Sequence, residues 1–251
     1  MPLSPAVDFR AIYDAFHSPT TPIDCGLMCA PHNPHGIPFC CDICSAVPVA
    51  YQSEWQYLRK NTDLWHVWRG DECAGEDNNR KQLMAQTPPH LRLLACKGST
   101  ECQRDFRAVS CRQFPFFPYL TSDYRLIGMT YDWEFTAKCW VISNLAAVTA
   151  DYRREFFNTF DHIFSTWLED MDSYIELSVE TREHYAAKHR RIPLLHRNSG
   201  AYLISPLSER MVRVSVNAFK PFHPYANSHS QDTAQSTHNA RVENIRLSGY
   251  D

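Results

Sequence analysis

The chain has 251 residues, 44% of them hydrophobic and 13% aromatic, which is enough to bury one sizeable core. Its 25 Lys and Arg against 28 Asp and Glu give a formal net charge of -3, without the basic excess typical of proteins that bind nucleic acids or anionic membranes. The first residues lack a secretory signal, and no apolar stretch reaches the roughly 18 residues of a membrane span. We therefore expect a soluble, cytoplasmic protein with no nucleic-acid or membrane partner.

The first elements along the chain are short. Residues 7–17 place aromatic and aliphatic side chains at the spacing of one helix face, which predicts a short helix. The segment 25–48 contains several prolines and a glycine, which interrupt helices and sheet ladders, so an irregular loop ordered by a bound metal is predicted. Ser53 precedes a second short helical pattern, and the polar residues 69–82 predict a surface loop.

Two longer helices are predicted in the second half of the chain. Thr149 or Asp151 is a suitable cap, and apolar residues then recur at helical spacing from Phe156 to Leu168. This pattern predicts a core helix of about five turns. Residues 173–190 predict a more polar helix, which ends in a basic run suited to a helix C-terminus.

Strands are predicted at three places. Residues 124–135 mix aromatic and β-branched side chains, which favours a strand or hairpin against the core. Two short apolar runs within residues 193–206 flank Asn-Ser-Gly, a hairpin signal, and residues 211–216 alternate as a strand does.

The predicted fold class is α+β, mainly helical. A compact cysteine-rich, metal-binding portion with irregular loops covers residues 1–142, and a helical portion with a small hairpin packs on it over residues 143–225. The polar residues 226–251 predict a flexible tail.

Ten cysteines are the outstanding feature of the composition. Because the chain lacks an export signal, so many cysteines favour metal ligation or redox chemistry over structural disulfides. Five fall within twenty residues and three recur later, while two stand alone and none follows Cys139. Their positions are Cys25, Cys29, Cys40, Cys41 and Cys44, then Cys96, Cys102 and Cys111, with Cys73 and Cys139 isolated.

The spacing of the cysteines indicates soft-metal sites. Cys41 and Cys44 have the two-residue gap that turns two thiolates towards one metal, while the adjacent Cys40 is free to serve a second site. The later group of three cannot close a four-coordinate site, so the two groups are expected to meet in space and to complete one or two sites. Thiolates suit zinc and iron-sulfur clusters; we prefer iron, as a 4Fe-4S cluster, with zinc as the alternative.

A motif in the later group carries a family resemblance. Residues 111–116 have the form C-R-x-F-P-F, preceded by Arg107 and, at suitable distances, by Cys96 and Cys102. The sequence here resembles the YkgJ-like family of zinc- or iron-chelating cysteine-cluster proteins. The resemblance covers residues 25–142 and implies metal binding by the matching cysteines. Glu54 falls in the region of the recurring acidic residue of that family, and Cys139 fits its later cysteine.

The chain also departs from the family pattern. Ala108 replaces the usual proline, and the first group has an insertion between Cys29 and Cys40 and a fifth cysteine, which leaves the pairing of its ligands open. A relative of the family, the flagellin lysine methylase, has a similar cysteine cluster. Only the metal is carried over from it, because no glycine-rich turn for a methyl donor is recognisable in this chain.

The predicted metal ligands share the grouped spacing, and Cys73 is left out as the weakest candidate. They are Cys25, Cys29, Cys40, Cys41, Cys44, Cys96, Cys102, Cys111 and Cys139, with Arg112 as the residue expected to contact the cofactor.

Other interpretations of these residues stay open. A single cysteine is often a small buried apolar residue, although grouped spacing argues against that for the set. His32 and His35 are alternative ligands in a mixed site, but loop histidines are usually solvated. Arg112 and Arg107 are expected to donate hydrogen bonds towards the cluster, with an ordinary ion pair as the alternative. The aromatic residues after Arg112 form either a lid over the cluster or plain core.

The sequence leaves the catalytic question open. It has no nucleophile elbow, no phosphate-binding loop and no H-E-x-x-H motif. Three functions remain: an iron-sulfur protein that supports redox chemistry or modifies a protein or peptide, a structural zinc-binding interaction module, and a metal-trafficking protein.

Overall fold

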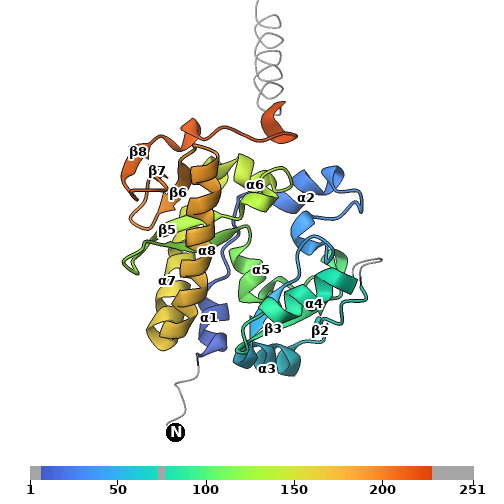
Figure 1. Cartoon of the computed structure of the whole chain (residues 1–251). Helices are drawn as coiled ribbons and strands as arrows, with labels where there is room; N and C mark the ends of the chain where they lie inside the picture. The colour runs from blue at the N-terminus through green and yellow to red at the C-terminus, as the bar shows by residue number, and fades with distance from the viewer. Residues whose placement is uncertain (1–6, 73–76, 228–251) are drawn as a thin grey trace, which may run out of the picture.

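The computed structural model describes residues 7–72 and 77–227 (Figure 1). Cys73 and nearly all of the predicted tail, residues 228–251, lie outside the described residues. The helices are α1 (Phe9–Ala15), α2 (Cys25–Cys29), α3 (Gln52–Asn61), α4 (Asp77–Gln86), α5 (Val109–Gln113), α6 (Trp140–Ser143), α7 (Ala150–Thr166) and α8 (Leu168–Ala187). Short 3-10 helices near the cysteines are η1 (Ala30–His32), η2 (Phe39–Cys41), η3 (Ser99–Glu101) and η4 (Arg104–Phe106).

Two antiparallel sheets account for the strands of the described part. The strands are β1 (Val49–Tyr51), β2 (Trp65–Val67), β3 (Leu91–Cys96), β4 (Phe116–Leu120), β5 (Leu126–Tyr131), β6 (Ile192–His196), β7 (Ala201–Ile204) and β8 (Met211–Val214). One sheet has the order β1-β3-β2 and the other β4-β5-β6-β7-β8. The prediction of a mainly helical chain is therefore wrong, because the three-stranded sheet was not foreseen and the hairpin is part of a larger sheet.

The three-stranded sheet was missed because its strands are too short to carry a period-two pattern. Two of them have only three residues each, Val49–Tyr51 and Trp65–Val67, and both pair with the central β3. The sheet places the end of β3, and with it Cys96, beside Trp65. The predicted surface loop over residues 69–82 is also partly wrong, since α4 begins at Asp77.

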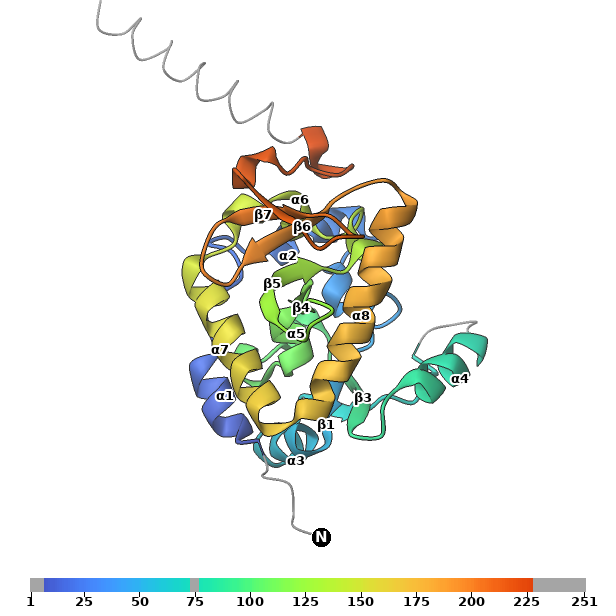
Figure 2. The ribbon, with the colours of Figure 1, turned by 60° about the vertical axis from the view of Figure 1, so that its left-hand side comes forward.

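The predicted core helix is confirmed as α7. The Thr149 side chain caps it by accepting a hydrogen bond from the Tyr152 amide at 3.2 Å. Its apolar face is fully buried at Phe156 and Phe160, whose ring centroids lie 4.8 Å apart. The chain breaks at Trp167 and continues as α8, which contacts β4 and β6. Figure 2 shows α7 and α8 diverging from this junction on either side of the strands.

The five-stranded sheet takes strands from both sides of the predicted boundary at residue 142. β5 pairs with β6 through Gly128 opposite His196 and Met129 opposite Leu195. A side chain at Gly128 would place its Cβ 2.7 Å from both the Leu194 side chain and the Leu195 carbonyl, so only glycine allows this approach. The core of the two portions is consequently shared.

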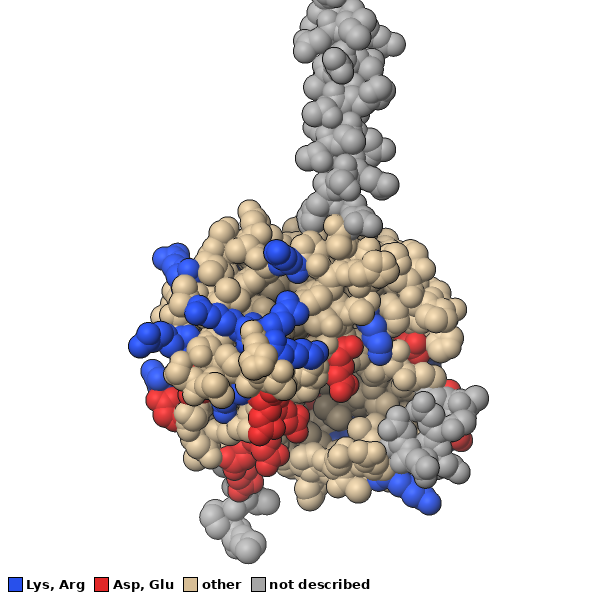
Figure 3. All heavy atoms as spheres, turned by 45° about the horizontal axis from the view of Figure 1, so that its top comes forward, with Lys and Arg blue, Asp and Glu red and all other residues tan. Residues whose placement is uncertain are grey.

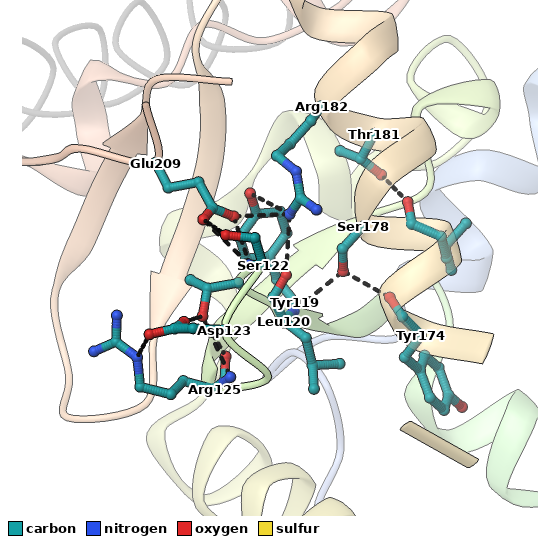
Figure 4. A network of polar contacts seen from close by, with 12 residues as sticks. Tyr119, Leu120, Ser122, Asp123, Arg125, Tyr174, Ser178, Thr181, Arg182 and Glu209 are labelled. Atoms are coloured by element: carbon teal, nitrogen blue, oxygen red, sulfur yellow. Dashed lines mark hydrogen bonds and ion pairs between the residues drawn. The ribbon is translucent and has the colours of Figure 1, made fainter. Parts of the chain in front are cut away.

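A polar network ties α8 to the sheet (Figure 4). Arg182, on α8, donates to the Leu120 carbonyl at 3.1 Å and to the Glu209 carboxylate at 2.9 Å. Glu209 in turn accepts from the amide and the hydroxyl of Ser122. The buried Ser178 hydroxyl accepts from the Leu120 amide and donates to the Tyr174 carbonyl. The network therefore joins the turn after β4 to the turn before β8.

We expect Arg182→Met to lower the free energy of unfolding by about 2 kcal/mol, because it leaves the Leu120 carbonyl and the Glu209 carboxylate without a mostly buried donor. Chemical denaturation measures the change. Arg125→Met is the matched control, since its ion pair with Asp123 lies at the surface of the same network and should leave stability nearly unchanged. Equal losses of stability in Arg182→Met and Arg125→Met would show that the buried hydrogen bonds of Arg182 do not stabilise the fold.

None of the helices within residues 7–72 and 77–227 combines the length and the apolar character that crossing a membrane requires. On the face shown in Figure 3, Lys and Arg side chains gather on the left, where Figure 1 places β6 to β8. The upper right of that face, on the side of α2, shows few charged side chains.

Candidate metal centre

Within residues 7–72 and 77–227, eight free thiols come from segments that are far apart in the sequence. They are Cys25, Cys29, Cys40, Cys41, Cys96, Cys102, Cys111 and Cys139. Cys44, a predicted ligand, is instead disulfide-bonded in this structure and does not belong to the free thiols.

Four of the thiols line one pocket. Cys25 and Cys29 come from the two ends of α2, Cys40 from η2, and Cys139 from the residue that precedes α6. We call these four the α2 group. Apolar side chains complete the lining, namely Phe39, Phe114, Pro115 and Val141. Burial raises the pKa of the Cys139 thiol to about 12 and that of Cys29 above its ordinary value, so a metal would have to displace the protons.

The other four thiols lie around α5. Cys41 follows Cys40 in η2, Cys96 ends β3, Cys102 follows η3, and Cys111 is in α5; we call them the α5 group. Burial raises the pKa of Cys111, and the neighbouring Cys96, Cys41 and Cys102 add to the shift. Two of these segments, β3 and α5, are brought together because β3 pairs with β1, which in turn contacts α5.

Arg107 supplies a positive charge to the α5 group. Its Nε donates to the Cys102 sulfur at 3.2 Å. Burial opposes the charge, but this hydrogen bond and the thiols of Cys102, Cys41 and Cys111 hold the pKa of Arg107 above its usual range. A guanidinium among thiolates would stabilise a negatively charged metal cluster.

The two groups adjoin at η2. The Cys40 thiol interacts with the Cys41 sulfur, which raises the pKa of Cys40 and lowers that of Cys41. Gly26 lets η2 approach α2, because a Cβ at this position would lie 2.9 Å from the Pro38 ring. The sequence does not predict this contact, because the need for glycine at position 26 is apparent only when the residue packed against it, Pro38, is known.

Asp42 orders the loop that was expected to depend on a metal. Its buried carboxylate accepts from the Asn33 amide at 3.1 Å and from the Cys44 amide at 3.1 Å, and it pairs with the His35 ring at 2.9 Å. Burial acts against the charge, yet the hydrogen bonds from Asn33 and His35 hold the pKa of Asp42 below its ordinary value. His32 packs edge-on against Tyr225. Of the two predicted alternative ligands, His35 is thus paired with Asp42, a carboxylate that the sequence prediction overlooked.

Arg112 points its donors at main-chain oxygens. It donates to the carbonyls of Phe16, Asp105 and Arg107, and it stacks over the Tyr13 ring at 4.3 Å. Its guanidinium therefore links the end of α1 to the segment before α5, while Arg107 is the arginine that contacts a thiol.

Glu54 is fully buried beside Arg112 and receives three hydrogen bonds. It accepts from the Tyr13 hydroxyl and the Val109 amide, each at 2.7 Å, and from the Tyr51 amide at 3.1 Å. The Val109 amide opens α5, so Glu54 holds the helix that carries Cys111.

The residues present fit an iron-sulfur cluster by their chemistry. All eight donors are soft thiols, and the α2 group is shielded by aromatic and proline side chains. In the described part of the chain, the buried Ser110 hydroxyl, one residue before Cys111, has no hydrogen-bond partner and is a free donor beside the α5 group. Among the same residues, no three His, Cys, Asp or Glu converge closely enough to hold a single ion.

Comparisons with known proteins add no relative. No family model matches the chain, no curated protein matches its sequence, and no solved structure matches its fold. The likeness to the YkgJ-like family stays a prediction from the motif at residues 111–116.

Proposed function

We propose that the thiols of this chain bind iron as an iron-sulfur cluster, and that the bound cluster supports redox chemistry or the modification of a protein or peptide. One observation carries the proposal: eight free thiols from six segments between residues 25 and 139 gather, four of them in one pocket and four around α5. Free cysteines that serve only as small apolar residues have no reason to gather in this way. Membership of the YkgJ-like family is part of the same proposal.

The geometry favours a cluster over a single ion. A tetrahedral zinc ion draws four thiolates to about 2.3 Å from one point. In a 4Fe-4S cluster each thiolate binds a different iron, so the four sulfurs do not need to meet. The thiols of this chain are grouped without converging on one point within the described residues. Zinc is the alternative metal, because thiolates suit zinc as well as iron and a metal that cross-links η2 to α2 would stabilise their packing.

An exposed apolar surface beside the thiols supports a protein or peptide as the partner. Ile23, just before α2, is 50% exposed, and Leu27 and Met28, on α2, are 73% and 38% exposed. Apolar side chains next to a metal centre are suited to docking another polypeptide, and neither nucleic acid nor membrane is proposed. Because ligation requires reduced thiols, we propose the cytoplasm as the compartment.

Protein purified without oxygen should be brown, with broad visible absorption, iron and acid-labile sulfide. Elemental analysis with a visible spectrum measures this directly. The control is the same preparation treated with a chelator and an oxidant, which should lose the colour and the sulfide together. Colourless protein that contains zinc and no iron would overturn the proposal in favour of a structural zinc module.

A further inference from the structure

The eight free thiols separate into two sets of four. The pocket between α2 and α6 is lined by Cys25, Cys29, Cys40 and Cys139, and by none of the other four thiols. The thiols that act electrostatically on Cys139 are Cys25 and Cys29, members of the same set. This set is therefore complete within one apolar pocket.

The other four thiols interact with one another around α5, and Cys41, at the junction, also acts on Cys29 of the α2 group. The thiols that act on Cys111 are Cys96, Cys41 and Cys102, and those that act on Cys96 are Cys41 and Cys102. Arg107 contacts Cys102 and acts on Cys41 and Cys111, and more remotely on Cys25 of the α2 group. No member of this set lines the pocket of the α2 group.

Adjacent cysteines divide between the sets at η2. Successive side chains of a 3-10 helix project about 120° apart, because the helix has three residues per turn. Cys40 lines the α2 pocket, while Cys41 is a neighbour of Cys96 and Cys111. The Cys40-Cys41 pair thus gives one ligand to each set and brings the two sets side by side.

We propose that the chain holds two separate four-thiolate sites, the α2 group and the α5 group, each of which takes one 4Fe-4S cluster. This inference rests on the proposed function and goes beyond it in the number of clusters and in the ligands of each. Each set supplies the four cysteines that such a cluster uses.

The two sites differ in charge. The α2 pocket is lined by apolar side chains, whereas Arg107 places a guanidinium 3.2 Å from the Cys102 sulfur. A positive charge stabilises the more negative, reduced state of a cluster, so the cluster in the α5 group has the higher reduction potential. The two clusters then have unequal reduction potentials, and the peptide bond between Cys40 and Cys41 connects their ligand sets.

The experiment counts iron and sulfide in anaerobically prepared protein and in single-site variants. We expect about eight irons per wild-type chain, and about half of that in Cys139→Ala and in Cys102→Ala, since each variant removes one four-iron site. The double variant should hold none. Cys25→Ala and Cys96→Ala repeat the test within each set, and Cys44→Ala, outside both sets, should keep the full content.

The outcomes separate the two claims. About four irons per wild-type chain, all lost in either single variant, would overturn the two-site assignment and leave the proposed function standing. A wild-type chain with no iron would overturn both. Retention of half the iron in each variant shows by itself that the variant has folded.

A redox titration monitored by electron paramagnetic resonance tests whether the charge of Arg107 acts mainly on the cluster of the α5 group. Arg107→Met should lower the potential of one cluster more than that of the other, because Arg107 contacts Cys102 directly and acts on Cys25 only from a distance. Arg125→Met, which removes an exposed ion pair with Asp123 in the turn between β4 and β5, is the control and should move neither. Equal shifts of both clusters in Arg107→Met would overturn the placement of Arg107 at one site.

Discussion

Replacing Arg112 by methionine is expected to lower the free energy of unfolding by about 4 kcal/mol and the Tm by about 10 °C. Methionine fills similar space but leaves the carbonyls of Phe16, Asp105 and Arg107 without their buried donor. The loss is large because the hydrogen bond to the Phe16 carbonyl is buried between α1 and α5. Thermal and guanidinium unfolding of the protein as purified measure the change.

Arg112→Lys is the informative companion. Lysine keeps the positive charge, but one ammonium group cannot reach the three carbonyls that Nε, Nη1 and Nη2 of the planar guanidinium reach in different directions. We therefore expect Arg112→Lys to recover less than half of the loss of stability. Arg10→Met, at an exposed position on α1, controls for the loss of an arginine. Stability within about 1 kcal/mol of the wild type in Arg112→Met would show that the link between α1 and α5 is not important.

The second large effect is on the pH dependence of stability, through Glu54. Burial raises its pKa from an ordinary 4.5 to about 7, in spite of the hydrogen bonds from Tyr13, Val109 and Tyr51. The folded state therefore binds one more proton than the unfolded chain between these two pH values. The contribution of Glu54 to stability is greatest below pH 4.5, falls as the pH rises to about 7, and is constant above it. The total fall is about 3 kcal/mol.

Glu54→Gln should remove this fall. The amide keeps an acceptor for Tyr13 and Val109 but presents a donor to the Tyr51 amide, a fixed cost of about 1 to 2 kcal/mol at every pH. From about pH 5 to about pH 8 the variant should gain about 3 kcal/mol relative to the wild type. Urea unfolding of both proteins over this range measures the difference between their free energies of unfolding. Titration of the thiols affects both proteins equally and cancels in that difference.

Glu101→Gln is the control for Glu54→Gln, because Glu101 is an exposed carboxylate in the residue before Cys102. Its stability should follow that of the wild type at all pH values. Parallel pH curves for the wild type and Glu54→Gln would mean that Glu54 is ionised in the folded protein throughout the range, and the prediction would be wrong.

Local patterns in the sequence predicted the elements with strong periodicity. The helix beginning after Thr149 was found because its buried phenylalanines repeat over almost five turns, and the β6-β7 hairpin because Asn198 to Gly200 interrupt two apolar runs. The short strands β1 and β2 were missed, because three residues carry no period and their pairing with β3 depends on partners far along the chain.

By itself the sequence determined the chemistry of the candidate site: the number of cysteines, the soft-donor character of their thiols and the C-R-x-F-P-F motif are local facts that need no fold. The tertiary structure alone decided how the thiols divide. Cys139 joins Cys25 across more than a hundred residues, and Cys40 and Cys41 face different partners although they are adjacent. The physical reason is that a ligand set is defined by side-chain directions and by the packing of α2, α5 and α6, which spacing along the chain does not encode.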